Sequence, residues 1–163
     1  MVAPAWPDEV ERVAAHLRES GAESRVEEFE DGTPTAEAAA RAVGCELAQI
    51  VKSLVFVCDG AAVLAMLPGD RRADAAKVAA AAGCTRARIA GAAQVRAATD
   101  FEPGAVAPFP LPRVRSVFID RSLLRHRLVW IGAGSPRHMA ALTPSELVRL
   151  AQATPMDAVE SDT

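Results

Sequence analysis

Three short segments of the sequence hold residue types that could do chemistry, and the first is a lysine inside an apolar run. Lys52 lies in the stretch QIVKSLVFVCDG, which is otherwise apolar from Ile50 to Cys58 except for Ser53. An ammonium group on an apolar face must reach water, find an anionic partner or serve a ligand. A cation held in place could bind a phosphate or stabilise a developing negative charge. The alternative is a lysine whose stem lies on apolar surface while its ammonium stays in solvent.

The second segment is the loop PGAVAP, framed by Gly104 and Pro108. A glycine lets a ligand approach the backbone and leaves neighbouring N–H groups free to point at an oxygen. Pro108 fixes its own φ and biases Ala107 toward an extended conformation, which stiffens the loop. The alternative is a plain surface connection between a helix and a strand.

The third segment, IGAGSPRHM, contains Gly132 and Gly134 followed by Ser135 and His138. It is not a dinucleotide-binding fingerprint, because the third glycine and a directly following helix are missing. The glycines could equally mark a bend at a strand end, and His138 could lie on the surface. The sequence has no paired His, Asp and Glu spacing for a metal and no G-x-S-x-G elbow for a serine nucleophile.

The composition limits the classes of protein to consider. A chain of 163 residues suits a single domain, and its net charge of −3 gives no global basic field to attract DNA or RNA. The three cysteines form no C-x-x-C pair, which suits a reducing cytosol without disulfides or zinc. No segment resembles a signal peptide or a membrane span. We therefore expect a cytoplasmic protein that uses no metal or cofactor and contacts neither membrane nor DNA.

Any contact with RNA must be local, through clusters of arginines. The alternative for each cluster is a solvated face without a ligand, which is the usual state of exposed arginines. The segment from Arg121 to Arg127, which includes Arg125, is favoured because its only neighbouring acid is Asp120. The other clusters are Arg71 with Arg72, Arg86 with Arg88, and Arg113 with Arg115.

The elements that must position these residues alternate irregularly between helix and strand. The spacing of apolar residues and the capping residues predict helices over 7–21, 33–44, 74–84, 92–100 and 143–153. Strands are expected over 24–32, 50–58, 61–70, 85–90, 114–120 and 127–134, and the pair around Asp59-Gly60 should form a hairpin. Residues 101–112, with four prolines, must be an ordered loop or a disordered linker. A mixed sheet with helices packed around it follows.

The last ten residues, 154–163, are polar and acidic. They show no apolar pattern that would dock, so we expect a disordered tail outside a single domain spanning 8–153. Removal of the tail from Asp157 onward is expected to leave activity unchanged.

Several segments taken in order resemble the YbaK family of aminoacyl-tRNA deacylases, which is related to the editing insertion domain of bacterial prolyl-tRNA synthetase. The segments are TAEAAARAVGCELAQIVKSLVF, LPGDRRADAAKVA, PGAVAP, VFID and GAGSPRHMAALTPSELVRL, within residues 8–152. The resemblance implies an α+β fold with a mixed, partly barrel-like sheet surrounded by helices. It also implies hydrolysis of the ester that links a wrong amino acid to the 3′ end of a tRNA, without a metal or cofactor.

The resemblance also implies roles for residues of this chain. Lys52 matches the lysine these enzymes need, Gly104 matches the glycine that shapes the site, and His138 matches a histidine of editing relatives. We also expect substrate contacts from Ser53, Pro108, Gly134 and Ser135, tRNA contacts from Arg121, Arg125 and Arg127, and a structural role for Asp120 as a cap of the following turn. The chain lacks a tyrosine that some relatives place near the site.

The sequence therefore predicts a free-standing trans-editing deacylase acting on the acceptor end of tRNA, such as tRNA for proline charged with cysteine or alanine. Prolyl-tRNA synthetase is a possible partner. The alternative is a non-catalytic module with the same fold that binds a nucleotide, a tRNA end or another protein. The sequence does not distinguish among small amino acids, since one methylene changes binding by only about 1–3 kcal/mol.

Overall fold

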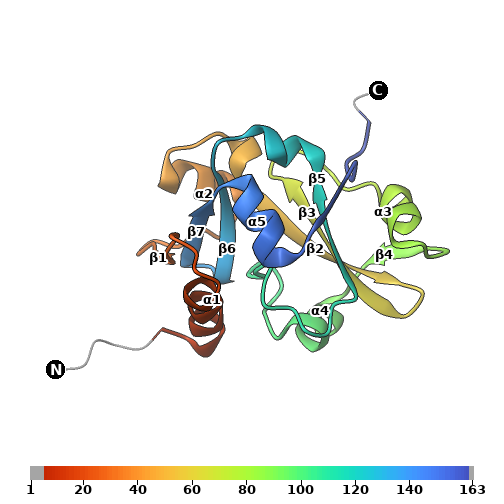
Figure 1. Cartoon of the computed structure of the whole chain (residues 1–163), viewed down its shortest axis with the longest axis horizontal. Coiled ribbons are helices and arrows are strands. Elements are labelled where there is room, and N and C mark those ends of the chain that lie inside the picture. Colours follow the sequence, from red (N-terminus) through yellow and green to blue (C-terminus); the bar gives the residue numbers. More distant parts are fainter. Residues whose placement is uncertain (1–5, 162–163) are drawn as a thin grey trace.

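The computed structural model describes residues 6–161, and these form two sheets lying side by side with helices packed around them (Figure 1). The first sheet has the strand order β1-β7-β6, and the second has the order β4-β2-β3-β5-β8. The predicted mixed α+β architecture is confirmed, and the sheets do not close into a barrel. The helices are α1 (Asp8–Glu19), α2 (Ala36–Val43), α3 (Ala75–Ala82), α4 (Ala92–Thr99) and α5 (Pro144–Ala151), with 3-10 turns η1 (Leu47–Gln49) and η2 (Arg121–Arg125). The strands are β1 (Glu27–Glu28), β2 (Val51–Cys58), β3 (Ala61–Pro68), β4 (Ala87–Ile89), β5 (Ser116–Asp120), β6 (Val129–Ser135), β7 (His138–Leu142) and β8 (Thr154–Met156).

The hairpin of β2 and β3 is the centre of the larger sheet. Its turn is Asp59-Gly60, and both residues have a positive φ of 48° and 87°. This conformation fits the right-handed twist of the two strands, and Asp-Gly favours it. The register pairs Lys52 with Leu67 and runs unbroken to Cys58 opposite Ala61. The predicted hairpin is confirmed.

The smaller sheet contains a strand that the sequence analysis missed. β7 pairs with β6 antiparallel, with an irregularity between Gly132 and Ser135, and it pairs with β1 on its other side. The expected strand over 24–32 is reduced to the two residues of β1. An isolated parallel bridge between Ile50 and Trp130 joins the start of β2 to β6 and so connects the two sheets.

Helix ends follow the predicted capping residues. Thr35 accepts a hydrogen bond from the N–H of Ala38 at the start of α2, and Thr143 accepts one from Glu146 at the start of α5. Gly44 ends α2 in the left-handed conformation. These caps fix the two ends of α2, and the packing of Ala39 and Ala40 against Ile50 places the helix next to the start of β2, where Lys52 lies.

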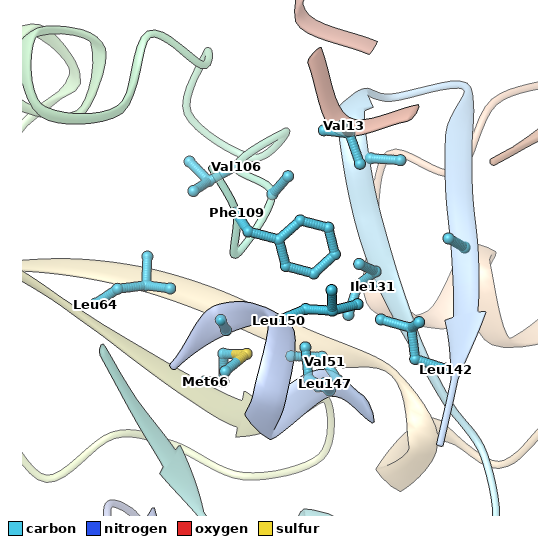
Figure 2. Packing of buried hydrophobic residues seen from close by; sticks show 14 of the residues in the cluster. Val13, Val51, Leu64, Met66, Val106, Phe109, Ile131, Leu142, Leu147 and Leu150 are labelled. Carbon is cyan, nitrogen blue, oxygen red and sulfur yellow. The ribbon is translucent and has the colours of Figure 1, made fainter. Parts of the chain in front are cut away.

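The proline-rich segment 101–112 is an ordered loop that belongs to the core. Phe101 and Phe109 are almost completely buried, and Val106 is 8% exposed. Figure 2 shows the Phe109 ring pointing toward Ile131 of β6, with Leu150 of α5 beside it. Burial of these side chains fixes a loop that lacks regular hydrogen bonding.

The prediction of a disordered tail is wrong for residues 154–161. β8 extends the larger sheet parallel to β5, and Met156, Ala158 and Val159 are buried. The carboxylate of Asp120 accepts a hydrogen bond from the N–H of Ala158. The sequence did not reveal β8 because a short edge strand can form with few apolar residues of its own. Its hydrogen bonds come from pairing with β5, and only Met156 of the strand is buried.

Candidate functional site

One cavity of about 280 Å³ collects five of the predicted site residues. It lies where β2, the start of α2, the β6–β7 turn and the 101–112 loop meet. Lys52, Ser53, Gly104, Ser135 and His138 all line it. The other lining residues are Thr33, Pro34, Thr35, Ala36, Ala39, Ile50, Val51, Leu54, Val106, Gly132, Pro136 and Met139.

Backbone contacts hold the walls of this cavity together. The N–H and hydroxyl of Thr33 both donate to the carbonyl of Pro136, which ties the start of α2 to the β6–β7 turn. The side-chain amide of Gln49 donates to the carbonyl of Leu128 at 3.1 Å, next to the Ile50–Trp130 bridge. The walls therefore come from separate parts of the chain and are joined by hydrogen bonds.

Lys52 is half-buried, and its Nζ donates to the carbonyl of Arg71. Burial lowers the pKa of Lys52 from its ordinary value, while the carboxylates of Asp70 and Glu37 oppose the shift and Arg72 adds to it. An ammonium has three donors, so the contact with Arg71 leaves others for a ligand. The site thus holds a positioned cation in partly desolvated surroundings, where charge interactions are stronger than in water.

Ser53, the next residue, presents an oxygen to the same cavity. Its Oγ is buried and has no hydrogen-bond partner among residues 6–161. A buried polar atom without a partner carries a desolvation cost of about 1–3 kcal/mol, so a ligand that bonds to it gains a comparable amount. Ser53 is thus suited to contact a substrate.

Gly104 lies at the exposed end of the loop with φ at 81°, and a Cβ added there would meet nothing within 4 Å. The N–H of Ala105 is used by the carbonyl of Glu102, whereas the N–H of Gly104 has no partner in the described part of the chain. The glycine is therefore required by the backbone conformation, and its N–H is free to bond a ligand oxygen.

Ser135 and His138 form a polar relay at the β6–β7 turn. Ser135 Oγ lies 2.5 Å from His138 Nδ1 and accepts a hydrogen bond from the N–H of Arg137. The other ring nitrogen, Nε2, lies 3.2 Å from the carboxylate of Glu28 at ion-pair distance but without hydrogen-bond alignment. The reading of His138 as a surface residue is wrong, because it is 3% exposed and its ring contacts Trp6 edge-on.

Two of the expected substrate contacts lie elsewhere. A Cβ on Gly134 would approach the backbone oxygen of Glu9 to 2.8 Å, so this glycine allows α1 to pack closely against β6. Pro108 is buried and lines a different cavity, together with His16 and Phe109. Both residues support the walls from behind and do not line the site.

Arg121, Arg125 and Arg127 are exposed on and beside η2, and none lines the site cavity. Asp120 caps this turn, since its carboxylate accepts from the N–H and the hydroxyl of Ser122. The expected structural role of Asp120 is therefore confirmed.

The sequence analysis missed three contributors to the site. Gly69 lies against the start of β2, because a Cβ there would come within 2.7 Å of the carbonyl of Leu47. Thr33 and Glu28 act through contacts between segments about a hundred residues apart, which no local pattern reveals. Of the three, only Gly69 could have been found from the sequence, because it lies in the turn sequence Leu-Pro-Gly-Asp that follows a strand.

Within residues 6–161 there is no group of three or more His, Cys, Asp or Glu side chains placed to hold a metal ion. The helices of the same part of the chain are all too short or too polar to span a membrane.

Comparison with known proteins places this cavity in a family. The model of the aminoacyl-tRNA editing domain matches residues 30–150, which include all the residues of the site cavity. The chain belongs to this family. It is 35% identical to the uncharacterized protein YwhH of Bacillus subtilis (strain 168) over 136 residues, covering 83% of this chain and 86% of YwhH.

Solved structures agree with the family. A protein provisionally described as a trans-editing enzyme for prolyl-tRNA synthetase superposes with a TM-score of 0.89 at 35% identity, covering 96% of this chain and 100% of that one. The hypothetical protein APE2540 superposes with a TM-score of 0.85 at 28% identity, covering 94% of this chain and 100% of that one. The fold is therefore that of the YbaK family.

Proposed function

We propose that this member of the editing family is a free-standing deacylase that hydrolyses the ester of a mischarged aminoacyl-tRNA. The observation that carries the proposal is the convergence of Lys52, Ser53, Gly104, Ser135 and His138 on one cavity. These residues supply a cation, a free backbone donor and polar side chains, and they come from three separate segments. Such an arrangement suits stabilisation of a negatively charged intermediate.

An aminoacyl ester is already activated, so the site needs orientation and charge stabilisation more than a strong nucleophile. Lys52 binds the anionic end of the substrate, through a phosphate or ribose oxygen of the terminal adenosine. Its contact with Arg71 holds the ammonium in place before the substrate arrives. In this role the charge of Lys52, and not its basicity, is what matters.

The N–H of Gly104 is the donor for the oxygen on which negative charge develops when the ester carbonyl is attacked. The attacking group is a water molecule or a hydroxyl of the substrate's own ribose. Ser135 and His138 border the same cavity and hold the polar edge of the substrate, with Glu28 positioning the His138 ring. Ser53 Oγ gains a partner when the substrate binds.

The cavity volume favours a small substrate. About 280 Å³ lies at the lower limit of ordinary ligand sites, which measure about 300–1,000 Å³. Such a space suits a small aminoacyl group on a ribose, such as alanine or cysteine on tRNA for proline. The proposal further includes a cytoplasmic location, where tRNA is charged, and association with prolyl-tRNA synthetase.

The test is a hydrolysis time course on tRNA for proline charged separately with alanine, cysteine, serine and proline. We expect cleavage of at least one non-cognate ester and no cleavage of the proline ester. For substitutions of Lys52, the Arg18→Ala variant is the matched control, because Arg18 is an exposed cation on α1 that does not line the cavity. Binding of tRNA without cleavage of any ester would favour the non-catalytic module instead.

A further inference from the structure

A second hollow on the molecule, which we call the hairpin groove, has no role in the site described above. It measures about 470 Å³ and lies over the far end of the β2–β3 hairpin. Val57 and Ala62 form its floor, α4 forms one wall, and the segment 112–115 forms the other. The floor is apolar, whereas Gln94, Arg113 and Arg115 give the walls polar ends.

The sheet brings two arginine clusters together across this floor. Val57 of β2 pairs with Arg88 on one side and with Ala62 on the other. The N–H of Arg115 donates to the carbonyl of Ala62 at 2.9 Å, immediately before the β3–β5 ladder begins. Side chains of directly opposed residues share one face of a sheet. Arg88 and Arg115 therefore flank the apolar floor, although 27 positions separate them in the sequence.

The charges of this groove are not neutralised from within the protein. Arg115 lines the groove and Arg88 lies beside it; both are exposed, and neither forms an ion pair within residues 6–161. Arg88 donates only to the neutral amide of Gln94 at 3.2 Å. By contrast, Arg113 is held by the carboxylate of Asp100 at 2.6 Å. The groove therefore presents uncompensated guanidinium groups, which favour a ligand carrying phosphates.

The groove and the site cavity border the same strand and the same connecting segment. Ser53 of the site and Val57 of the groove lie four residues apart on one face of β2, a distance of about 13 Å. The segment from α4 to Val106 lies between the two cavities, with Gln94 bordering the groove and Gly104 bordering the site. A polymer held at its end in the site could continue into the groove.

We propose that the hairpin groove binds the ribose–phosphate backbone of RNA next to the acceptor end, through Arg88 and Arg115. This inference rests on the proposed function, which puts the 3′ end of a tRNA in the site cavity. The apolar floor accommodates a ribose or base edge, while the two guanidinium groups bind phosphates on either side. The groove thus supplies a local basic surface on a chain whose net charge is −3.

The test compares the double variant Arg88→Gln/Arg115→Gln with wild type in binding uncharged tRNA for proline at several salt concentrations. We expect the affinity to fall about tenfold or more, and the slope of log K against log salt to fall by about two, one for each lost phosphate contact. The matched control is Arg18→Gln/Arg41→Gln, which removes two exposed charges outside the groove and should bind like wild type. Thermal melts confirm that both variants are folded.

Cleavage of an aminoacyl ester on a short oligonucleotide ending in CCA separates this inference from the proposed function. The groove variant should cleave it at the wild-type rate, because the short substrate fills only the site. If wild type cleaves no ester, the proposed function fails, while the tRNA-binding comparison still decides the groove. Equal tRNA affinity in the groove variant and wild type overturns the inference. It is also overturned if the substitutions abolish binding of polyglutamate but not of tRNA, since that outcome indicates an acidic protein partner.

Discussion

At the scale of single residues, the site depends on groups whose surroundings differ from those of ordinary surface side chains. Lys52 is a partly desolvated cation held by a backbone carbonyl, and Ser53 has a buried oxygen without a partner in the described structure. His138 is buried between Ser135 and Glu28. Ser53 Oγ and His138 Nε2 have no hydrogen-bond partner within residues 6–161, which costs stability unless a ligand supplies one. Such groups are typical of a binding site.

The lowered pKa of Lys52 predicts an alkaline limit to activity. The proposed role requires the protonated amine, so the enzymatic rate should fall as pH rises through the pKa of Lys52, at a pH below the ordinary lysine value of about 10.4. The measurement is the single-turnover rate against pH after subtraction of spontaneous ester hydrolysis. In Lys52→Arg the remaining activity should persist to higher pH, because a guanidinium keeps its proton. A flat profile in wild type would contradict the role of the charge.

The cysteines provide a second prediction at this scale. Burial, with a smaller contribution from contact with Cys84, raises the pKa of the Cys58 thiol to about 12, and its side chain is completely buried. Cys58 should therefore resist alkylation by iodoacetamide at pH 8 in the native protein and react fully in guanidinium chloride. Peptide mass spectrometry after timed labelling measures this, and rapid native labelling of Cys58 would show that the strand end opens readily.

At the scale of elements, the sequence identified the parts of the site that carry local signals. The β2–β3 hairpin followed from an apolar run around Asp-Gly, and α2 followed from its caps at Thr35 and Gly44. β7 was missed because its sequence, HMAAL, has no alternation and few branched residues. Its pairing with β6, and the relay through Glu28, depend on contacts that only the folded chain creates.

The tail is an element whose importance was wrongly predicted. Ala73 forms a bridge with Val159, and the N–H of Glu160 donates to the carbonyl of Arg72 at 2.8 Å. The neighbouring carbonyl of Arg71 accepts the hydrogen bond of Lys52. The tail therefore supports the segment that positions the proposed catalytic cation.

A chain ending at Ala153 should lose both stability and activity, in contrast to the sequence-based expectation. Removal of buried Met156, Ala158 and Val159 is expected to lower the free energy of unfolding by roughly 3–5 kcal/mol. Urea denaturation measures the first effect, and the rate at a temperature where the truncated chain is folded measures the second. Asp157→Asn is the control, since it removes the exposed ion pair with Lys77 and leaves the buried side chains of the tail in place. Unchanged stability of the truncated chain would refute the docking of the tail.

Gly69 provides the corresponding test at the start of β2. In Gly69→Ala the new methyl group would lie 2.7 Å from the carbonyl of Leu47 and 3.3 Å from that of Ile50, so the backbone must shift. We expect a loss of roughly 1–3 kcal/mol in the free energy of unfolding, together with a slower reaction. Gly91→Ala is the matched control, because its nearest neighbour would be the Gln94 side chain at 3.8 Å. Equal melting temperatures of the two variants would contradict this account.

At the scale of the whole molecule, the site cavity lies where the two sheets are joined. The Ile50–Trp130 bridge and the bond from Gln49 to Leu128 bring the start of β2 against β6, so the cavity forms at the junction. The hairpin groove lies at the other end of β2. One strand thereby connects a small cavity suited to an aminoacyl end with a basic hollow suited to the adjoining backbone.

The central claim is that the charge of Lys52 in this cavity accelerates ester hydrolysis. The most direct test is the single-turnover rate of Lys52→Met on the non-cognate aminoacyl-tRNA that wild type cleaves fastest. We predict a loss of about a hundredfold or more, as for removal of one stabilising donor, with the melting temperature little changed. Cleavage by Lys52→Met at the wild-type rate would contradict the account.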